Sequence, residues 1–151
     1  MKNLIARVEV LSNGIVSAGM GCFDGEENLD VATTHTLIDL IEQSIPDDQT
    51  LEALVVQAKA GRYISPNPAM PDWGVNDINI WLAPPMAQPG HVCITNENTE
   101  YSSDEDHGNP QQFTYAQFHA ALNHWREFRE LMAREGKEHL VGRRYVAVFP
   151  E

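Results

Sequence analysis

Basic side chains are scarce in this sequence. Lys and Arg total 10 against 22 Asp and Glu, which gives a formal net charge of −12 at pH 7. Proteins that bind nucleic acids or anionic membrane surfaces use Lys and Arg to neutralise phosphate groups, so we expect neither partner for this chain. The composition, 42% hydrophobic and 21% charged, is typical of a chain that folds and excludes a collagen-like or wholly disordered one.

Long apolar runs and cysteine clusters are also missing. Lys2, Arg7 and Glu9 interrupt the first apolar residues, so no signal-peptide core is predicted, and no run approaches the roughly 18 apolar residues of a membrane span. The two cysteines, Cys22 and Cys93, belong to no Cys-x-x-Cys pair and to no Cys/His ligand spacing. We therefore expect two reduced thiols, a cytoplasmic location, no metal site and no cofactor.

The few basic residues are unevenly placed. Between Val8 and Trp125 only Lys59 and Arg62 are basic, whereas residues 113–151 carry six basic and five acidic side chains. Most carboxylates therefore have few cations near them along the chain, and we expect them to face solvent or a partner.

The first part of the chain predicts a β-hairpin followed by two helices. Apolar residues alternate over 4–11, and Ser12-Asn13-Gly14 supplies a tight turn before a second strand over 15–23. Thr33 or Thr34 is expected to cap a helix that Pro46 stops, and a second helix is expected to follow Asp47-Asp48 and to end at Gly61.

The second part predicts two strands, a long helix and a last strand. One strand is expected over 77–82, inside a Pro-rich connection (65–90), and another over 91–95, before an acidic polar loop (96–112). Thr114-x-x-Gln117 forms a capping box that predicts an amphipathic helix over Tyr115–Glu135, and a strand is expected over 140–149. The order β-β-α-α-β-β-α-β over one domain, 1–151, predicts an α+β fold whose largely antiparallel sheet packs on helices.

Motifs for catalysis and cofactors are weak. Gly19 and Gly21 resemble part of a dinucleotide loop, but acidic residues follow where phosphate would bind. Residues 104–108 do not match a calcium loop, and His119 and His124 are five residues apart, one too many for a helical zinc pair. We therefore predict a protein that is not an enzyme. A small hydrolase, with His and carboxylate groups converging from distant segments, stays open as an alternative.

The acidic loop carries the leading functional hypothesis. Its five carboxylates repel one another, and a basic protein would relieve that repulsion and associate faster through electrostatic steering. We predict an inhibitor that occludes a basic site on a nuclease or nucleic-acid-binding protein, as an immunity protein, an antitoxin or a phage-encoded anti-defence protein. The predicted contact residues are Glu97, Glu100, Tyr101, Asp104, Glu105 and Asp106, with Trp73 as an aromatic anchor.

A second hypothesis is a protein that binds or sequesters a small ligand. Tyr63, Arg62 and Trp73 would form its pocket, and Arg143 and Arg144 would hold an anionic group. The sequence leaves open whether the chain forms a homo-oligomer.

Overall fold

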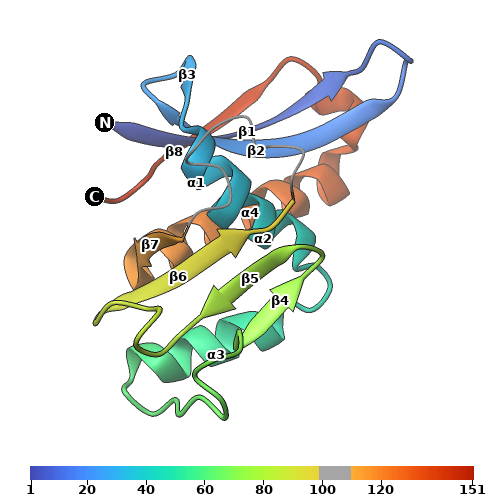
Figure 1. Cartoon of the computed structure of the whole chain (residues 1–151). Coiled ribbons are helices and arrows are strands. Elements are labelled where there is room, and N and C mark those ends of the chain that lie inside the picture. The colour runs from blue at the N-terminus through green and yellow to red at the C-terminus, as the bar shows by residue number, and fades with distance from the viewer. Residues whose placement is uncertain (99–109) are drawn as a thin grey trace.

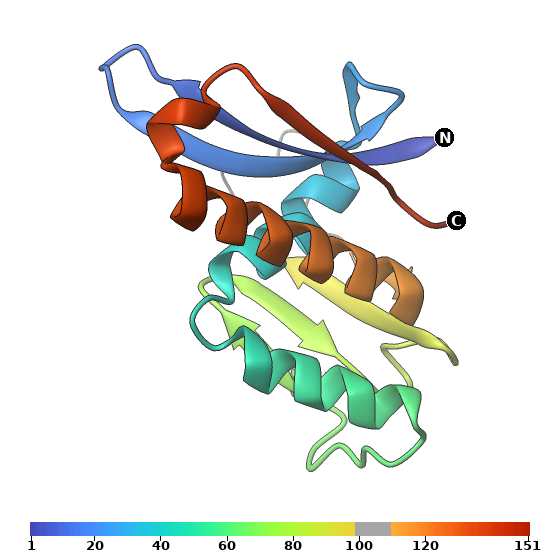
Figure 2. The same ribbon diagram turned by 180° about the vertical axis from the view of Figure 1, so that it is seen from behind.

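The computed structural model describes residues 1–98 and 110–151. Its fold is α+β, as predicted: two antiparallel sheets of four strands are joined and covered by helices (Figures 1 and 2). The sequence led us to expect one sheet, so the division into two is a difference that the structure reveals.

The N-terminal hairpin forms as the alternation predicts. Strands β1 (Lys2–Val10) and β2 (Val16–Asp24) pair from Lys2↔Asp24 to Val10↔Val16. Between them Gly14 has a φ of 83°, a left-handed conformation that glycine adopts without strain. The hairpin is the centre of the first sheet, whose order is β3-β2-β1-β8, with β3 (Asn28–Leu29) and β8 (Arg144–Val148) at the two edges.

A helical segment of three parts leads from the first sheet to the second. It consists of α1 (Val31–Thr33), the π-helical turn η1 (Thr34–Ile38) and α2 (Asp39–Gln43). The Asp30 side chain caps it by accepting a hydrogen bond from the Thr33 backbone N–H, so the cap expected at Thr33 or Thr34 is wrong by three residues or more. The next helix, α3 (Asp48–Lys59), starts and ends where Asp47 and Gly61 predict.

The second sheet has the order β4-β5-β6-β7. Its strands are β4 (Trp73–Val75), β5 (Ile78–Trp81), β6 (His91–Asn96) and β7 (Gln111–Thr114). Strands β5 and β6 were expected, but β4 lies in the Pro-rich connection and β7 at the end of the acidic loop. Both are too short to show an alternating pattern, and β7 buries one side chain, Phe113.

Helix α4 (Tyr115–Glu135) has the predicted bounds. The Thr114 hydroxyl accepts a hydrogen bond from the Gln117 backbone N–H, and the Gln117 side chain accepts one from the Thr114 backbone N–H. A 3-10 turn, η3 (Lys137–Leu140), then occupies the start of the strand expected over 140–149. Among the described residues, no helix combines the length and the apolar character that crossing a membrane requires.

The core lies between the sheets and helices. Helix α4 and the α1–α2 segment run between the two sheets, and α3 covers the second sheet on the side seen in Figure 2. Leu4 of β1, Ile41 of α2, Ile94 of β6 and Phe118 of α4 are fully buried in one apolar cluster. Both sheets therefore depend on the same helices for their packing.

The capping box gives a first testable prediction. Thr114→Ala removes the hydroxyl that accepts the Gln117 N–H and should lower the free energy of unfolding by about 1 kcal/mol. Urea denaturation followed by circular dichroism measures the change. Thr114→Ser keeps the hydroxyl and should keep most of the stability, so equal losses in the two variants would contradict the role of the cap.

Candidate functional site

Most of the predicted contact residues lie outside the part of the chain that the structure describes. Glu97 follows β6 and is exposed, but Glu100, Tyr101, Asp104, Glu105 and Asp106 lie outside the described residues. Their role in binding a partner stays a prediction.

Trp73 and Tyr63 are held by Asp72. Trp73 was expected in a loop, but it begins β4 and packs half-buried against the core. The Asp72 carboxylate accepts hydrogen bonds from the Tyr63 hydroxyl at 2.6 Å, the Ser65 hydroxyl at 2.8 Å and the Leu82 backbone N–H at 2.7 Å. Burial and the neighbouring Asp72 raise the pKa of Tyr63 to about 12. These contacts give Asp72 and Tyr63 a clear structural role in fixing the Pro-rich segment on the second sheet.

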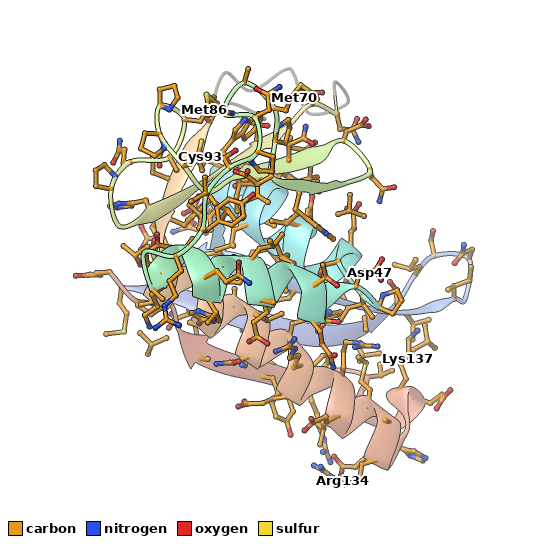
Figure 3. All side chains as sticks on the ribbon, turned by 90° about the horizontal axis from the view of Figure 1, so that it is seen from below. Asp47, Met70, Met86, Cys93, Arg134 and Lys137 are labelled. Atoms are coloured by element: carbon orange, nitrogen blue, oxygen red, sulfur yellow. The ribbon has the colours of Figure 1, made fainter. Side chains whose placement is uncertain are left out.

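The arginines of the ligand hypothesis lie on the other sheet. Arg143 and Arg144 are exposed at the start of β8, and the Arg144 guanidinium donates to the Glu26 carbonyl oxygen at 2.7 Å. Arg62 is exposed beyond the end of α3. The structure therefore places the arginine pair on the first sheet and Tyr63 and Trp73 against the second. Figure 3 shows Arg134 and Lys137 at and just beyond the end of α4, away from Met70 and Met86.

A polar depression lies where α2, the β4–β5 turn and the end of β6 meet. We call it the polar corner and define it by Asp39, Gln43, Asn76, Asp77, Asn96 and Asn98, which line it together with Ile78. Its volume is about 50 Å³, which is room for one or two water-sized groups. The corner therefore matches the end of a single polar side chain better than a whole metabolite.

Backbone and side-chain hydrogen bonds fix the shape of the polar corner. Asn76 has a φ of 52°, which asparagine tolerates better than most residues, and its amide donates to the Gln43 side-chain oxygen. Asn96 is 6% exposed; its amide donates to the His35 carbonyl oxygen at 2.6 Å, and its side-chain oxygen accepts from the Asn98 N–H at 2.9 Å. The turn and the strand end are thus tied to the helical segment.

Carboxylates dominate the electrostatics of the polar corner. Asp39 lies 3.3 Å from the His35 Nδ1 atom, and the two side chains are each 20% exposed. Burial raises the pKa of Asp39, while His35 acts in the opposite direction. Behind it, Glu42 accepts the Met20 backbone N–H at 2.6 Å, and burial together with the charge of Asp39 raises the pKa of Glu42 to about 7.

The lining of the polar corner is rich in hydrogen-bond acceptors. Its lining within the described residues holds the carboxyl groups of Asp39 and Asp77 and four carboxamides, but no Lys or Arg. Carboxylate and amide oxygens accept hydrogen bonds from ammonium and guanidinium groups. Across the described part of the chain, no group of three or more His, Cys, Asp or Glu side chains is arranged to hold a metal ion.

Comparisons with known proteins give no family. No protein-family model, no curated protein and no solved structure matches the chain. The site must therefore be argued from its own geometry.

Sequence reasoning missed most of the polar corner. Its residues are ordinary turn and helix-surface types, and 57 positions separate Asp39 from Asn96. One signal was present: Asn76-Asp77 stands between two short apolar runs, which is typical of a two-residue hairpin turn. That signal predicts the turn but not its neighbours in space.

Proposed function

We propose that this protein is a non-enzymatic inhibitor that binds a basic site on another protein. The observation that carries the proposal is the polar corner, which two carboxyl groups and four carboxamides line and which has no Lys or Arg among its described lining residues. A Lys or Arg side chain from the partner fits this chemistry, and Arg fits best because its planar guanidinium can bond carboxylate and amide oxygens together.

The burial of carboxyl groups supports a cationic partner. Asp39 and Glu42 lie within one helical turn, and each has a raised pKa because burial disfavours its charge. A guanidinium placed beside Asp39 stabilises the ionised form of both groups. Burying these carboxylates costs free energy in the unbound protein, and the attraction to the guanidinium would offset part of that cost.

The charge of the whole molecule supports association with a basic surface. The net charge is −12, and the ion pairs of the described residues engage three Lys or Arg side chains: Lys2, Arg7 and Arg126. The resulting negative potential would steer a basic protein toward the chain and raise the association rate. Nucleases and nucleic-acid-binding proteins present such basic surfaces, so immunity proteins, antitoxins and phage-encoded anti-defence proteins are the classes that we propose.

A defined peptide tests the polar corner directly. We expect a hexa-arginine peptide to bind the wild-type protein and to bind the double variant Asp39→Asn/Asp77→Asn at least about tenfold more weakly, a loss of about 1.4 kcal/mol. The matched control is Glu127→Gln/Glu130→Gln, which removes the same charge from the exposed face of α4. Fluorescence anisotropy with a labelled peptide measures all three affinities.

The controls distinguish a specific site from general acidity. Equal losses in the two double variants, or full binding by Asp39→Asn/Asp77→Asn, would contradict the role of the polar corner. Wild-type affinity should also fall steeply between about 0.1 M and 1 M salt, where the screening length shortens from about 10 Å to about 3 Å.

The natural target can be sought with the same variants. A basic protein that the wild type and the α4 control retain from a lysate of the source cells, but the corner variant loses, is the expected target, and its activity should fall when the wild type is added. The variant Asp104→Asn/Glu105→Gln/Asp106→Asn separately tests the prediction for the acidic loop.

A further inference from the structure

The rest of the chain protects one edge of the first sheet. Next to the two-residue β3, three outward-pointing backbone groups of β2 are already bonded. The Met20 N–H donates to the Glu42 carboxylate at 2.6 Å, the Cys22 N–H donates to the Thr34 hydroxyl at 3.0 Å, and the Cys22 carbonyl accepts from the Asp30 N–H at 2.8 Å. Side chains and a helix start thus occupy an edge that would otherwise pair with another strand.

At the opposite edge, formed by β8, the structure shows no such bonds from the described residues to the outward-pointing backbone groups. The Phe149 N–H donates to the Lys2 carbonyl oxygen at 2.9 Å, so the backbone groups of Phe149 face β1. Tyr145 and Ala147 lie four and two residues before Phe149 and pair with Ala6 and Leu4, so their backbone groups face β1 as well. Backbone groups alternate in direction along a strand, so those of Arg144, Val146 and Val148 point away from β1. Within the described chain no strand lies beyond β8 (Figure 2).

After Arg144, the remaining outward residues of this edge have apolar, exposed side chains. Val146 is 47% exposed and Val148 is 58% exposed, and both lie on the face of the sheet opposite α4. Natural proteins usually protect an edge strand with charges or proline, and β8 carries one charge, Arg144, at its start and no proline within Arg144–Val148. The part of the strand that holds Val146 and Val148 is therefore a template for pairing with another strand.

We propose that β8 pairs antiparallel with β8 of a second copy of this chain, with Val146 opposite Val146 of the other copy. In this register Arg144 lies opposite Val148 of the second copy, so each pairing joins residues whose backbone groups point outward. About six inter-strand hydrogen bonds would form, and the four valines would cover one another. The first sheet of one copy, β3-β2-β1-β8, would then continue into the first sheet of the other copy.

The charges near β8 fit a second copy of the chain. Arg143 and Arg144 precede the central valine and Glu151 follows it, so the antiparallel arrangement brings the arginines of each copy toward the glutamate of the other. The strand also belongs to residues 113–151, where six basic side chains balance five acidic ones. Two copies of a strongly acidic protein therefore meet where their mutual repulsion is weakest.

A pair of matched substitutions tests this interface. We expect the wild-type protein to sediment as a dimer at micromolar concentration and Val146→Lys to raise the dimer dissociation constant at least tenfold. The control is Ile15→Lys, which changes an aliphatic side chain that is 57% exposed in the β1–β2 turn and should leave the dimer intact. Analytical ultracentrifugation over a concentration series gives the constants, and circular dichroism verifies that each variant is folded.

Two further variants test the geometry of the pairing. Val146→Pro removes an N–H that points outward, so the monomer should fold while the dimer is lost. Val146→Cys should be joined across the dimer by a short bismaleimide, because the two introduced thiols would lie opposite each other. Ile15→Cys, in the β1–β2 turn, should not be joined. Both native cysteines are buried, so they should not react in either variant. A monomeric wild type throughout the series, a dimer that Val146→Lys leaves unchanged, or equal cross-linking of the two cysteine variants would overturn the proposal.

Discussion

Glu42→Gln should raise the free energy of unfolding by about 2–3 kcal/mol at pH 8 and change it little at pH 5. Burial raises the pKa of Glu42 from 4.5 to about 7, and a shift of one unit corresponds to about 1.4 kcal/mol. The folded protein therefore holds this proton more tightly than the unfolded chain does. As the pH rises from about 4.5 through about 7, the folded state binds more protons than the unfolded state, so wild-type stability falls with increasing pH.

Urea denaturation at several values between pH 5 and pH 8 measures this slope. Glutamine keeps an oxygen that can accept the Met20 N–H, so the edge of β2 remains capped. Glu130→Gln on the exposed face of α4 is the control and should preserve the wild-type slope. The raised pKa of Asp39 also lowers stability as the pH rises, so Glu42→Gln should keep a dependence of stability on pH that is shallower than in the wild type. A slope in Glu42→Gln as steep as in the wild type would contradict the assignment to Glu42.

Phe118→Ala should lower the free energy of unfolding by about 3–5 kcal/mol, the usual cost of deleting a buried phenylalanine ring. Phe118 is 0% exposed and belongs to the apolar cluster that includes residues of both sheets. The loss should destabilise both sheets together, because α4 contacts β1 of the first sheet and β6 and β7 of the second.

Two probes on the same urea titration test this coupling. Tryptophan fluorescence and far-ultraviolet circular dichroism should give coincident transitions in the wild type and in Phe118→Ala. Phe118→Leu retains most of the apolar volume and should lose clearly less stability. A loss below about 1 kcal/mol in Phe118→Ala, less than core truncations usually cost, would mean that α4 does not hold the two sheets together.

Sequence patterns predicted the elements whose signals are local and long enough to read. The hairpin of β1 and β2 has alternation on both sides of Asn13-Gly14, and α4 has a capping box, a continuous apolar face and Gly136 at its end. By contrast, β3 has two residues and β4 three, so neither contains a repeat of its pattern. Their pairing with longer neighbours, rather than their own sequence, makes them strands.

The candidate site was harder to predict because tertiary structure assembles it. Asp39, Asp77 and Asn96 come from a helix, a turn and a strand end, and no spacing along the chain relates them. The acidity of the chain indicated a cationic partner, but it did not show which carboxylates share a depression. Trp73 is another case: its proline-rich surroundings favoured a loop, whereas pairing with Ile80 places it in a sheet, and its role as an aromatic anchor stays a prediction.

Because strands are synthesised in sequence order, the pairing of β1 with β8 forms later than the other pairings of the chain. The second sheet uses strands from one continuous stretch, residues 73–114, and can pair while synthesis continues. The first sheet cannot be completed so early: β1 pairs with β2 close in sequence, but its other side pairs with Arg144–Val148, which is synthesised much later. Until β8 has been synthesised, the hairpin therefore carries the backbone groups of Leu4, Ala6 and Val8 without their partners from 141–148. That exposed side is where the chain is most prone to pair with the wrong strand, and docking of Arg144–Val148 on β1 removes the risk.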